Sequence, residues 1–395
     1  MASKRVAIPY KDIMMRIIGP KQDFYASRVQ RLDIPTNLPS TTVNELGNSR
    51  HAGTITDIPE VSCTFQAMDV SHKIYSYLTG TNPASYPAAG VDVSNLGNID
   101  IGVYIKDEST TDIVKSIHAR KLQITGFTYT YSVDAESTEE YSAEGTEKRY
   151  LRNDLYVEYA GICPSGVGAT FTLDYTPKQL KNGNYLISLI QDGLWKVEDE
   201  DYSVVGTTVT ISGACVSGII AVYHSDSYTD MTWTDQVRDS TIPAAIRGKN
   251  VPIRIATNQM DRVQSVTIRG TFPNTRIEEM GNINIVGYIV DPPDITGDLT
   301  VLDTDFEIIA LLCEGSISDT DTEYNVTEYE ERTLALRVEL LDPADNTTVL
   351  KTIRIPGMRI TSEGTTGNVG GQVTQTFGFV SDDAQCVVYS GAYGG

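Results

Sequence analysis

The feature that most constrains the fold of this chain is an internal repeat. Residues 29–78 align with residues 263–312 without a gap, at a constant offset of 234 residues and with fifteen identities in fifty positions. Many of the shared residues are glycines, prolines and aspartates, whose backbone roles are hard to replace. They include the pairs Gly47/Gly281, Gly53/Gly287, Pro59/Pro293 and Asp69/Asp303. The repeat resumes at residues 113–125, which align with 349–361 at an offset of 236, so the sequence predicts two fused copies of one domain.

Composition limits the classes of protein that this chain can belong to. At 395 residues it can hold two or three domains, each with its own core. Lysine and arginine total 31 against 52 aspartates and glutamates, giving a net charge of −21. Such a surface repels phosphate, so direct binding of nucleic acid by the general surface is not expected. Charged residues and Pro9 interrupt the first apolar segment, which predicts neither a signal peptide nor a membrane span.

Residue usage and short-range patterning predict an all-β fold, mainly strands with two short helices. The 22 tyrosines stand among many threonines, valines and isoleucines, and no long helical period is present. Each repeat reads as strand, turn, strand, helix, with the turn at Pro59 or Pro293. The first helix is expected to begin at Asp69 and to end at Gly80, and its counterpart to begin at Asp303.

Two stretches alternate strictly between apolar and polar residues near the end of each repeat. In the first, the phase changes at Gly126, which predicts a β-bulge there. Beyond the bulge, one face carries the aromatic residues Phe127, Tyr129, Tyr131 and Tyr141, and the other carries Thr128, Thr130, Ser132, Asp134 and Glu140. In the second repeat, Val373, Phe377 and Phe379 alternate with Thr374 and Thr376. We expect the aromatic face to pack into a domain core.

These patterns divide the chain into four segments. Residues 1–28 form a first strand or an arm that reaches a neighbouring subunit, and part of this segment recurs at 251–255, four residues out of phase with the main repeat. Residues 29–153 hold the first copy and residues 236–395 the second. Between them, residues 154–235 show short strands with frequent turn signals, which predict a small inserted β-sandwich at a point where insertion is tolerated.

Residue clusters that carry catalysis or bind cofactors are missing from the sequence. The four histidines are far apart in sequence, and no nucleophile-elbow or phosphate-loop motif occurs. Acidic runs at 192–201, 298–305 and 319–323 could chelate calcium, but none has EF-hand spacing, and solvated acidic turns are the simpler interpretation. The five scattered cysteines are expected to be free thiols, with Cys163–Cys215 the one bridge considered. We therefore expect no enzyme, no metal and no cofactor.

The run LQITGFTYTYSVDAESTEEYSAEG, preceded by the hairpin and helix, resembles the tail tube proteins of long-tailed bacteriophages. The resemblance covers roughly residues 29–149 and 251–382. The second copy departs from the pattern, with Gly370, Gly371 and Gln372 where the first has Asp134, Ala135 and Glu136, and it is recognised mainly through the repeat. The inserted segment in turn resembles the immunoglobulin-like decorations of virus particles.

The resemblance implies a structural virion protein without enzymatic activity. Each copy would be a half-open β-barrel or sandwich domain, and the domains would assemble into rings that stack into the hollow tail tube conducting the DNA genome during ejection. Members with one domain per chain form rings of six, so three two-domain chains would close a ring. The other implied partners are the tape measure, the baseplate or tip and the terminator, within a virion tail assembled in the host cytoplasm, with DNA passing through unbound.

Under this interpretation, the residues singled out fall into two sets. The set expected to line the lumen is Thr128, Thr130, Ser132, Asp134, Glu140, Thr374 and Thr376. The set expected in the domain cores and hairpins is Gly47, Gly53, Pro59, Asp69, Gly281, Gly287, Pro293, Asp303, Phe127, Tyr129, Tyr141 and Phe377. An acidic bore rich in threonine and serine would let a polyanion slide without binding.

Two other functions remain open from the sequence. The chain could be a different tail or baseplate component, or a host-recognition module whose inserted sandwich binds a surface glycan. It could also be an enzyme acting on a surface polymer, which would require two carboxylates facing each other across a cleft. Polymerisation separates the first two hypotheses, because a tube protein makes long hollow rods whereas a terminal component stops at one ring.

Overall fold

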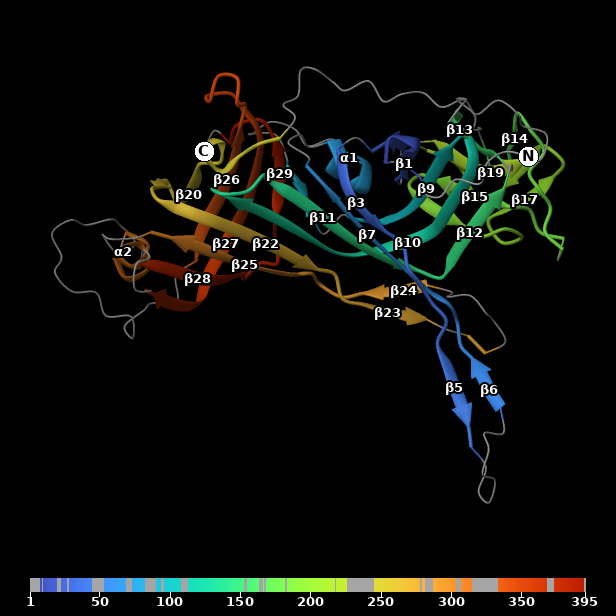
Figure 1. Ribbon diagram of the computed structural model, residues 1–395. Helices are drawn as coiled ribbons and strands as arrows, with labels where there is room; N and C mark the ends of the chain where they lie inside the picture. Colours follow the sequence, from blue (N-terminus) through green and yellow to red (C-terminus); the bar gives the residue numbers. More distant parts are fainter. Residues whose placement is uncertain are drawn as a thin grey trace.

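The computed structural model shows a chain built almost entirely of β-strands, with two short α-helices in its described part (Figure 1). The expected all-β fold class is thereby confirmed. The described residues are 8, 10–19, 23–26, 28–44, 53–68, 73–81, 90–93, 96–107, 113–152, 155–162, 166, 168–181, 183–216, 218–225, 245–277, 279–280, 287–302, 307–314, 333–367 and 373–393. Four residues that the repeat singled out, Gly47, Asp69, Gly281 and Asp303, lie outside these ranges.

The first half and the insertion contain the following elements in chain order. The first half has η1 (Tyr10–Asp12), β1 (Ile13–Ile18), β2 (Asp23–Tyr25), β3 (Val29–Asp33), β4 (Thr36–Asn37), β5 (Ser40–Val43), β6 (Gly53–Thr56), β7 (Glu60–Ala67), α1 (Lys73–Thr79), β8 (Val91–Asp92), β9 (Asn98–Lys106), β10 (Ile113–Ser132), β11 (Thr138–Gly145) and β12 (Glu147–Arg152). The insertion has β13 (Leu155–Ile162), β14 (Thr170–Thr172), β15 (Ile187–Gln191), β16 (Leu194–Lys196), β17 (Tyr202–Val205), β18 (Thr208–Ile211) and β19 (Ile219–Ser225).

The second half has a matching sequence of elements. They are η3 (Gly248–Asn250), β20 (Ile253–Ile255), β21 (Asn258–Met260), β22 (Val263–Thr271), β23 (Asn274–Ile277), β24 (Gly287–Val290), β25 (Asp294–Val301), α2 (Glu307–Glu314), β26 (Leu334–Leu341), β27 (Val349–Thr366), β28 (Thr374–Ser381) and β29 (Val387–Ser390).

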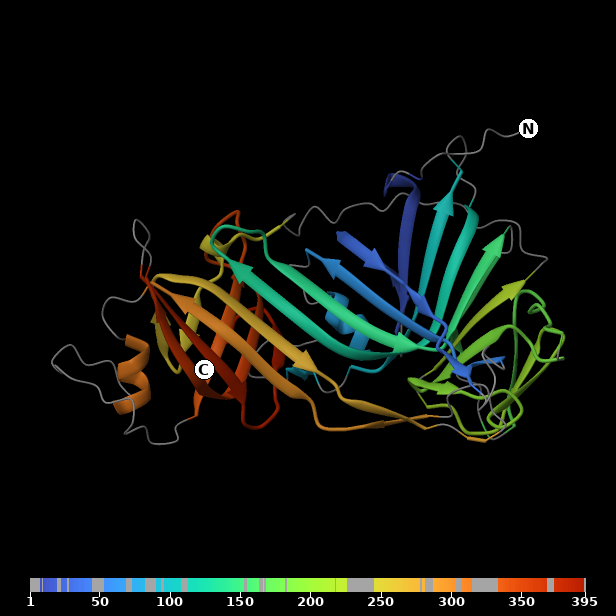
Figure 2. The ribbon, with the colours of Figure 1, turned by 60° about the horizontal axis from the view of Figure 1, so that its bottom comes forward.

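One antiparallel sheet crosses both halves. Its strand order is β3, β7, β11, β10, β22, β25, β28 and β27, so each half contributes four strands. Figure 2 shows the sheet with β10 and β22 side by side at its centre. Apolar and polar residues alternate along these strands, so one face packs into the core and the other remains polar.

A second layer in each half covers the apolar face of this sheet. It consists of β1, β9, β10 and β12 in the first half and of β20, β26, β27 and β29 in the second. Strands β10 and β27 span 20 and 18 residues, which lets them belong to both layers. Each changes register at a bulge, between Ile124 and Gly126 in β10 and between Ile360 and Ser362 in β27. The bulge predicted at Gly126 is thus present, and it turns the strand from one layer into the other.

The strand pairings of the two halves agree residue by residue. Ser40 faces Thr56 in the first hairpin, and Asn274 faces Val290 in the second, both 234 residues further on. Arg28 and Arg262, also 234 apart, both adopt a left-handed backbone conformation, with φ of 64° and 59°. The sequence repeat is therefore also a repeat of backbone geometry.

Other parts of the repeat follow slightly different offsets. Phe127 faces Tyr141 in the first half, and Glu363 faces Phe377 in the second, at an offset of 236. Elements η1 and β1 correspond to η3 and β20 at an offset of 238, four residues out of phase with the hairpin. That shift is the one the recurrence at 251–255 indicates, and it makes residues 10–18 part of the first half.

Both helices lie over the edge of a core. Ile74, Tyr75 and Leu78 of α1 are buried in the main hydrophobic cluster, with the spacing that brings residues to one helix face. The Tyr75 hydroxyl donates to the carbonyl oxygen of Val91 at 3.2 Å, which satisfies its buried polar end. In α2, Ile308 and Leu311 are buried in the same cluster.

The insertion consists of two sheets, in the orders β13, β19, β15, β16 and β14, β18, β17. Both contribute to one hydrophobic cluster, for example through Leu189 and Val209. Among the cysteines, Cys63 and Cys386 are buried free thiols and Cys215 takes part in a disulfide, while Cys163 lies outside the described residues. The expectation of free thiols is therefore wrong for Cys215. Within the described ranges, no helix is both long and apolar enough to cross a membrane.

Candidate functional site

The candidate functional site is the junction between the two halves. Its centre is the pairing of β10 with β22, in which Gly126 faces Thr271 and Ser132 faces Ser265. Two backbone hydrogen bonds flank the pairing: the amide of Phe272 donates to the carbonyl of Thr125 at 2.8 Å, and the amide of Val133 donates to the carbonyl of Gln264 at 2.9 Å. Odd-numbered residues of β10 therefore direct their backbone groups toward β22.

An aromatic side chain packs on a glycine at the centre of this pairing. Phe127 faces Gly270, and a Cβ atom at Gly270 would lie 2.1 Å from the Phe127 ring. The ring is 2% exposed and lies 6.0 Å from that of Phe272, centroid to centroid. Only glycine leaves room for the ring at this position, so the junction is packed as closely as a domain core.

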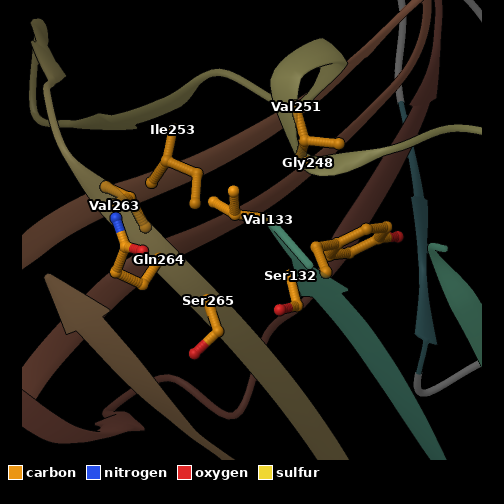
Figure 3. Close-up of a pocket in the computed structure, with 9 residues that line it drawn as sticks. Ser132, Val133, Gly248, Val251, Ile253, Val263, Gln264 and Ser265 are labelled. Atoms are coloured by element: carbon orange, nitrogen blue, oxygen red, sulfur yellow. The ribbon is translucent and has the colours of Figure 1, made fainter. Parts of the chain in front are cut away.

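The end of β10 fills a groove in the second half, which we call the second-half groove and define by Gly248, Val251, Ile253 and Val263. Figure 3 shows Ser132 and Val133 lying against these residues. The remaining cavity is only about 20 Å³. A Cβ at Gly248 would come within 2.6 Å of the Ser132 carbonyl oxygen, so the contact is close.

A buried ion pair joins the halves beneath the groove. Lys351 of β27 donates to Glu139 of β11, and their side chains are 0% and 1% exposed. The Tyr141 hydroxyl donates to the other Glu139 oxygen at 3.0 Å, and the Lys351 ammonium lies 5.4 Å from the centre of the Tyr129 ring. Every charge in this cluster therefore has a partner, which a buried ion pair requires.

The second-half hairpin completes the junction. Arg276 of β23 donates to Glu60 at 3.0 Å and to Glu144 at 3.2 Å, both in the first half. Side-chain hydrogen bonds from Asn37 and Arg276 hold the pKa of Glu60 below its usual range. The hairpin of β23 and β24 thus lies across the first half, whereas its counterpart, β5 and β6, extends away from the body (Figure 1).

The same groove in the first half is open. We call it the first-half groove and define it by Tyr10, Ile13, Met15, Ile34 and Ile117, which line a cavity of about 900 Å³. Its residues correspond by the repeat to those of the second-half groove.

Exposed fractions express the same difference. Ile13 is 41% exposed, whereas the corresponding Val251 is 8% exposed. Lys115, the counterpart of buried Lys351, is exposed.

Both outer strands of the large sheet also have one open edge. Within the described ranges, residues Ser362–Thr366 of β27 pair with β28 alone, and β3 pairs with β7 alone. Every residue from Ser362 to Thr366 is exposed. These edges are the counterparts of the edges of β10 and β22 that pair with each other inside the chain.

The residues predicted to line a lumen lie on the polar face of the large sheet. Thr128, Thr130, Ser132, Glu140 and Thr374 are partly buried there, Thr376 is exposed, and Asp134 lies exposed just beyond the end of β10. The residues predicted for the core, Phe127, Tyr129, Tyr141 and Phe377, are buried on the opposite face. Gly53 and Gly287 begin strands β6 and β24, and Pro59 and Pro293 directly precede β7 and β25.

Sequence reasoning missed part of this polar face. The cross-strand pairs extend it onto β7, β22 and β25, for example Gln66 opposite Glu140 and Arg269 opposite Thr128. Thr300 and Thr376 continue it, with their hydroxyl oxygens 3.4 Å apart. The alternation within those strands was a usable signal, although no aromatic residues marked the opposite face as clearly as in β10.

A second buried polar cluster joins the insertion to the first half. His118 lies between Asp100 and His224 of the insertion, with nitrogen-to-oxygen and nitrogen-to-nitrogen distances of 3.2 Å each. Trp195 donates from its indole nitrogen to Asp100 at 3.2 Å, and Arg120 donates to the carbonyl of Ile187 at 2.8 Å. The two histidines, distant in sequence, are thus neighbours in the fold.

This cluster is closed to solvent, so it has the character of a structural seam. His118, Asp100 and His224 are at most 2% exposed. Burial lowers the pKa of His224 to about 2 and lowers that of His118. Burial alone would raise the pKa of Asp100, but hydrogen bonding and charge from His118, with Arg120, hold it below its usual range. The carboxylate is therefore charged and both imidazoles are neutral.

Comparison with known proteins gives no match to any protein-family profile, and none to any curated protein sequence. In the described part of the chain, no three His, Cys, Asp or Glu side chains are grouped so that they could hold a metal ion. The function is therefore argued from the junction itself.

Proposed function

We propose that this protein is a non-enzymatic structural subunit that associates head to tail into rings, which stack into a tail tube of the bacteriophage type. The observation that carries the proposal is the contrast between the two grooves. The second-half groove is filled by β10 of the same chain, leaving about 20 Å³, while the corresponding first-half groove holds a cavity of about 900 Å³. The open edge of β27 is the corresponding surface that remains to fill it.

Head-to-tail association through such a heterologous surface generates a closed ring when the rotation closes. Ring closure would also pair both exposed edges of the large sheet, which otherwise invite irregular aggregation. The junction inside each chain is tethered covalently, so only the junction between chains must form at the expense of association entropy.

The polar face of the large sheet supports a conducting role. It carries hydroxyl groups and acidic side chains from both halves, and no described helix packs over it. A ring that places this face inward would give a hydrophilic bore with little affinity for phosphate. DNA, the tape measure and the tip and terminator proteins are the partners that follow from this proposal.

Electron microscopy of the purified chain tests the proposal. We expect rings of three chains with approximate six-fold symmetry, and hollow rods when the rings stack, with native mass spectrometry giving the trimer mass. Single rings that never stack would instead indicate a terminal tail or baseplate component. A chain that remains monomeric at high concentration, alone or with an initiating tail component, would refute the proposal.

The charge of the proposed bore can be tested separately. Replacing Asp134 and Glu140 by lysine should leave rods intact and cause them to retain double-stranded DNA at low salt, since the lysines attract phosphate. The matched control replaces Asp199 and Glu200, in a turn of the insertion, with the same change of charge. DNA retention is measured by fluorescence anisotropy across a salt series. Equal retention by both variants would place the two carboxylates outside the bore.

A further inference from the structure

We propose that the contact between chains is a β-strand addition whose register is set by the junction inside the chain. This inference rests on the proposed head-to-tail ring and identifies the segments that meet. Residues Ser362–Thr366 of one copy would add to the edge formed by Asp33–Asn37 of the next. Transferring the β10–β22 register by the repeat offsets places Ser362 opposite Asn37, Gly364 opposite Pro35 and Thr366 opposite Asp33.

Backbone groups on the receiving edge face the right way for this register. The amide of Ser62 donates to the carbonyl of Pro35 at 3.3 Å, so residues 33, 35 and 37 direct their backbone groups toward β7. Ile34 and Thr36 consequently present theirs to the open edge. Pro35, which has no amide hydrogen, thus occupies a position where the added strand does not need one.

The donating strand has the complementary phase. In β10, the backbone groups of Phe127 and Tyr129 face β22, and the corresponding residues of β27 are Glu363 and Thr365. These two residues would pair with Thr36 and Ile34, whose backbone groups are the ones left open. The phases of both strands therefore agree without any adjustment.

Side chains at the centre of the two junctions differ together. Inside the chain, Phe127 requires Gly270 opposite it because any Cβ there would collide with the ring. In the proposed contact, Glu363 replaces the phenylalanine and Thr36 replaces the glycine, so no ring has to be accommodated. Lys148, which lines the first-half groove, supplies a positive charge near Glu363.

A buried acceptor supports the same contact. The side-chain oxygen of Gln375 is buried and has no hydrogen-bond partner among the described residues. Gln375 is the counterpart of Glu139, which receives Lys351 from the other half. The counterpart of Lys351 is the exposed Lys115, so the next copy would bring its Lys115 to Gln375.

The repeat also shows where the added strand must end. Tyr10 occupies the position of Gly248, where a Cβ would lie 2.6 Å from the backbone of Ser132. The strand of the next copy must therefore diverge after Thr366, and the contact is limited to five residues of β27.

Paired cysteines in the full-length chain test the register. Thr366→Cys with Asp33→Cys places two thiols at a directly opposed position without hydrogen bonds between the pair, where Cα atoms are about 4.5 Å apart and a disulfide can form. On mild oxidation of assembled protein we expect covalent trimers on a denaturing gel. Thr130→Cys with Thr267→Cys, the corresponding pair inside the chain, is the positive control and should give cross-linked monomers.

Thr365→Cys with Asp33→Cys is the out-of-register control, because neighbouring residues of a strand point to opposite faces. Rings that form while this pair cross-links and the Thr366 pair does not would overturn the register and leave the proposed function standing. Rings in which neither pair cross-links would overturn the strand addition itself. Absence of rings from the unmodified chain would instead count against the proposed function.

Discussion

Replacing Lys351 by methionine is expected to destabilise the folded chain by about 3–5 kcal/mol, because it leaves the Glu139 carboxylate buried without a counter-charge. Both side chains are almost completely buried, and they belong to different halves. The tyrosine hydroxyl of Tyr141 that also donates to Glu139 satisfies hydrogen bonding but supplies no positive charge. Urea unfolding of the monomer, followed by circular dichroism, gives the change in the free energy of unfolding.

The double variant Lys351→Met with Glu139→Gln separates the loss of a partner from the loss of the pair. With both charges removed, we expect most of the stability to return, since buried ion pairs are often nearly neutral against uncharged replacements. The matched control is Lys115→Met, at the corresponding exposed position of the first half, with an expected change within about 0.5 kcal/mol. A loss below about 1 kcal/mol in Lys351→Met would show that the pair does not hold the halves together.

The sequence predicts the repeated elements well because their signals are local. Glycine, proline and aspartate punctuation marks the hairpins, and alternation marks β10, including the bulge at Gly126. The recurrence at 251–255 even indicates the shift that relates β20 to β1. Each of these signals depends on residues within one or two strands of each other.

Contacts between the halves could not be predicted in the same way. Lys351 and Glu139 are 212 residues apart, and His118 and His224 are 106 apart. Which side chains meet depends on which sheet edges pair, and no single-residue pattern encodes that choice. Arg276 likewise has no sequence signal, because Thr42 occupies its place in the first repeat.

The insertion illustrates the same limit. Its strands were predictable from turn spacing, and an appendage on which neither core depends was the natural expectation. The structure corrects that expectation: Ile190, Ile220 and Val222 of the insertion form one buried cluster with Met14 and Tyr104 of the first half. Removing the insertion would therefore expose an apolar surface and leave Arg120 without its partners in the insertion.

Acidification is expected to destabilise this seam strongly. In the folded chain the pKa of His224 is about 2, and that of His118 is also lowered. In the unfolded chain both titrate near 6.5. Between the folded and unfolded pKa values the unfolded chain binds more protons, so the free energy of unfolding falls as the pH falls. The loss is about 1.4 kcal/mol per pH unit below pH 6.5 for His224 alone, and none of it is expected above pH 7.

Charges around the histidines set the size of the effect. Arg120, Arg149 and Lys178 all oppose a proton on His224, while Asp100 and Glu147 favour one on His118. Because His118 donates to Asp100 and accepts from His224 only when both rings are neutral, protonating either ring breaks this arrangement. The lowered pKa of Asp100 adds a loss of the same sign, but only near and below pH 4.

The measurement is a series of urea unfolding midpoints between pH 4 and pH 8 for the native chain and for His224→Gln. Many carboxylates in a chain with a net charge of −21 also respond to acid, and the variant shares all of them. The difference between the two curves therefore isolates the imidazole. Glutamine has no proton to gain, so the native chain should lose stability more steeply than the variant between pH 6.5 and pH 4. Parallel curves over this range would mean that His224 is already protonated, or already exposed, in the folded protein, and the buried seam would then not exist in solution.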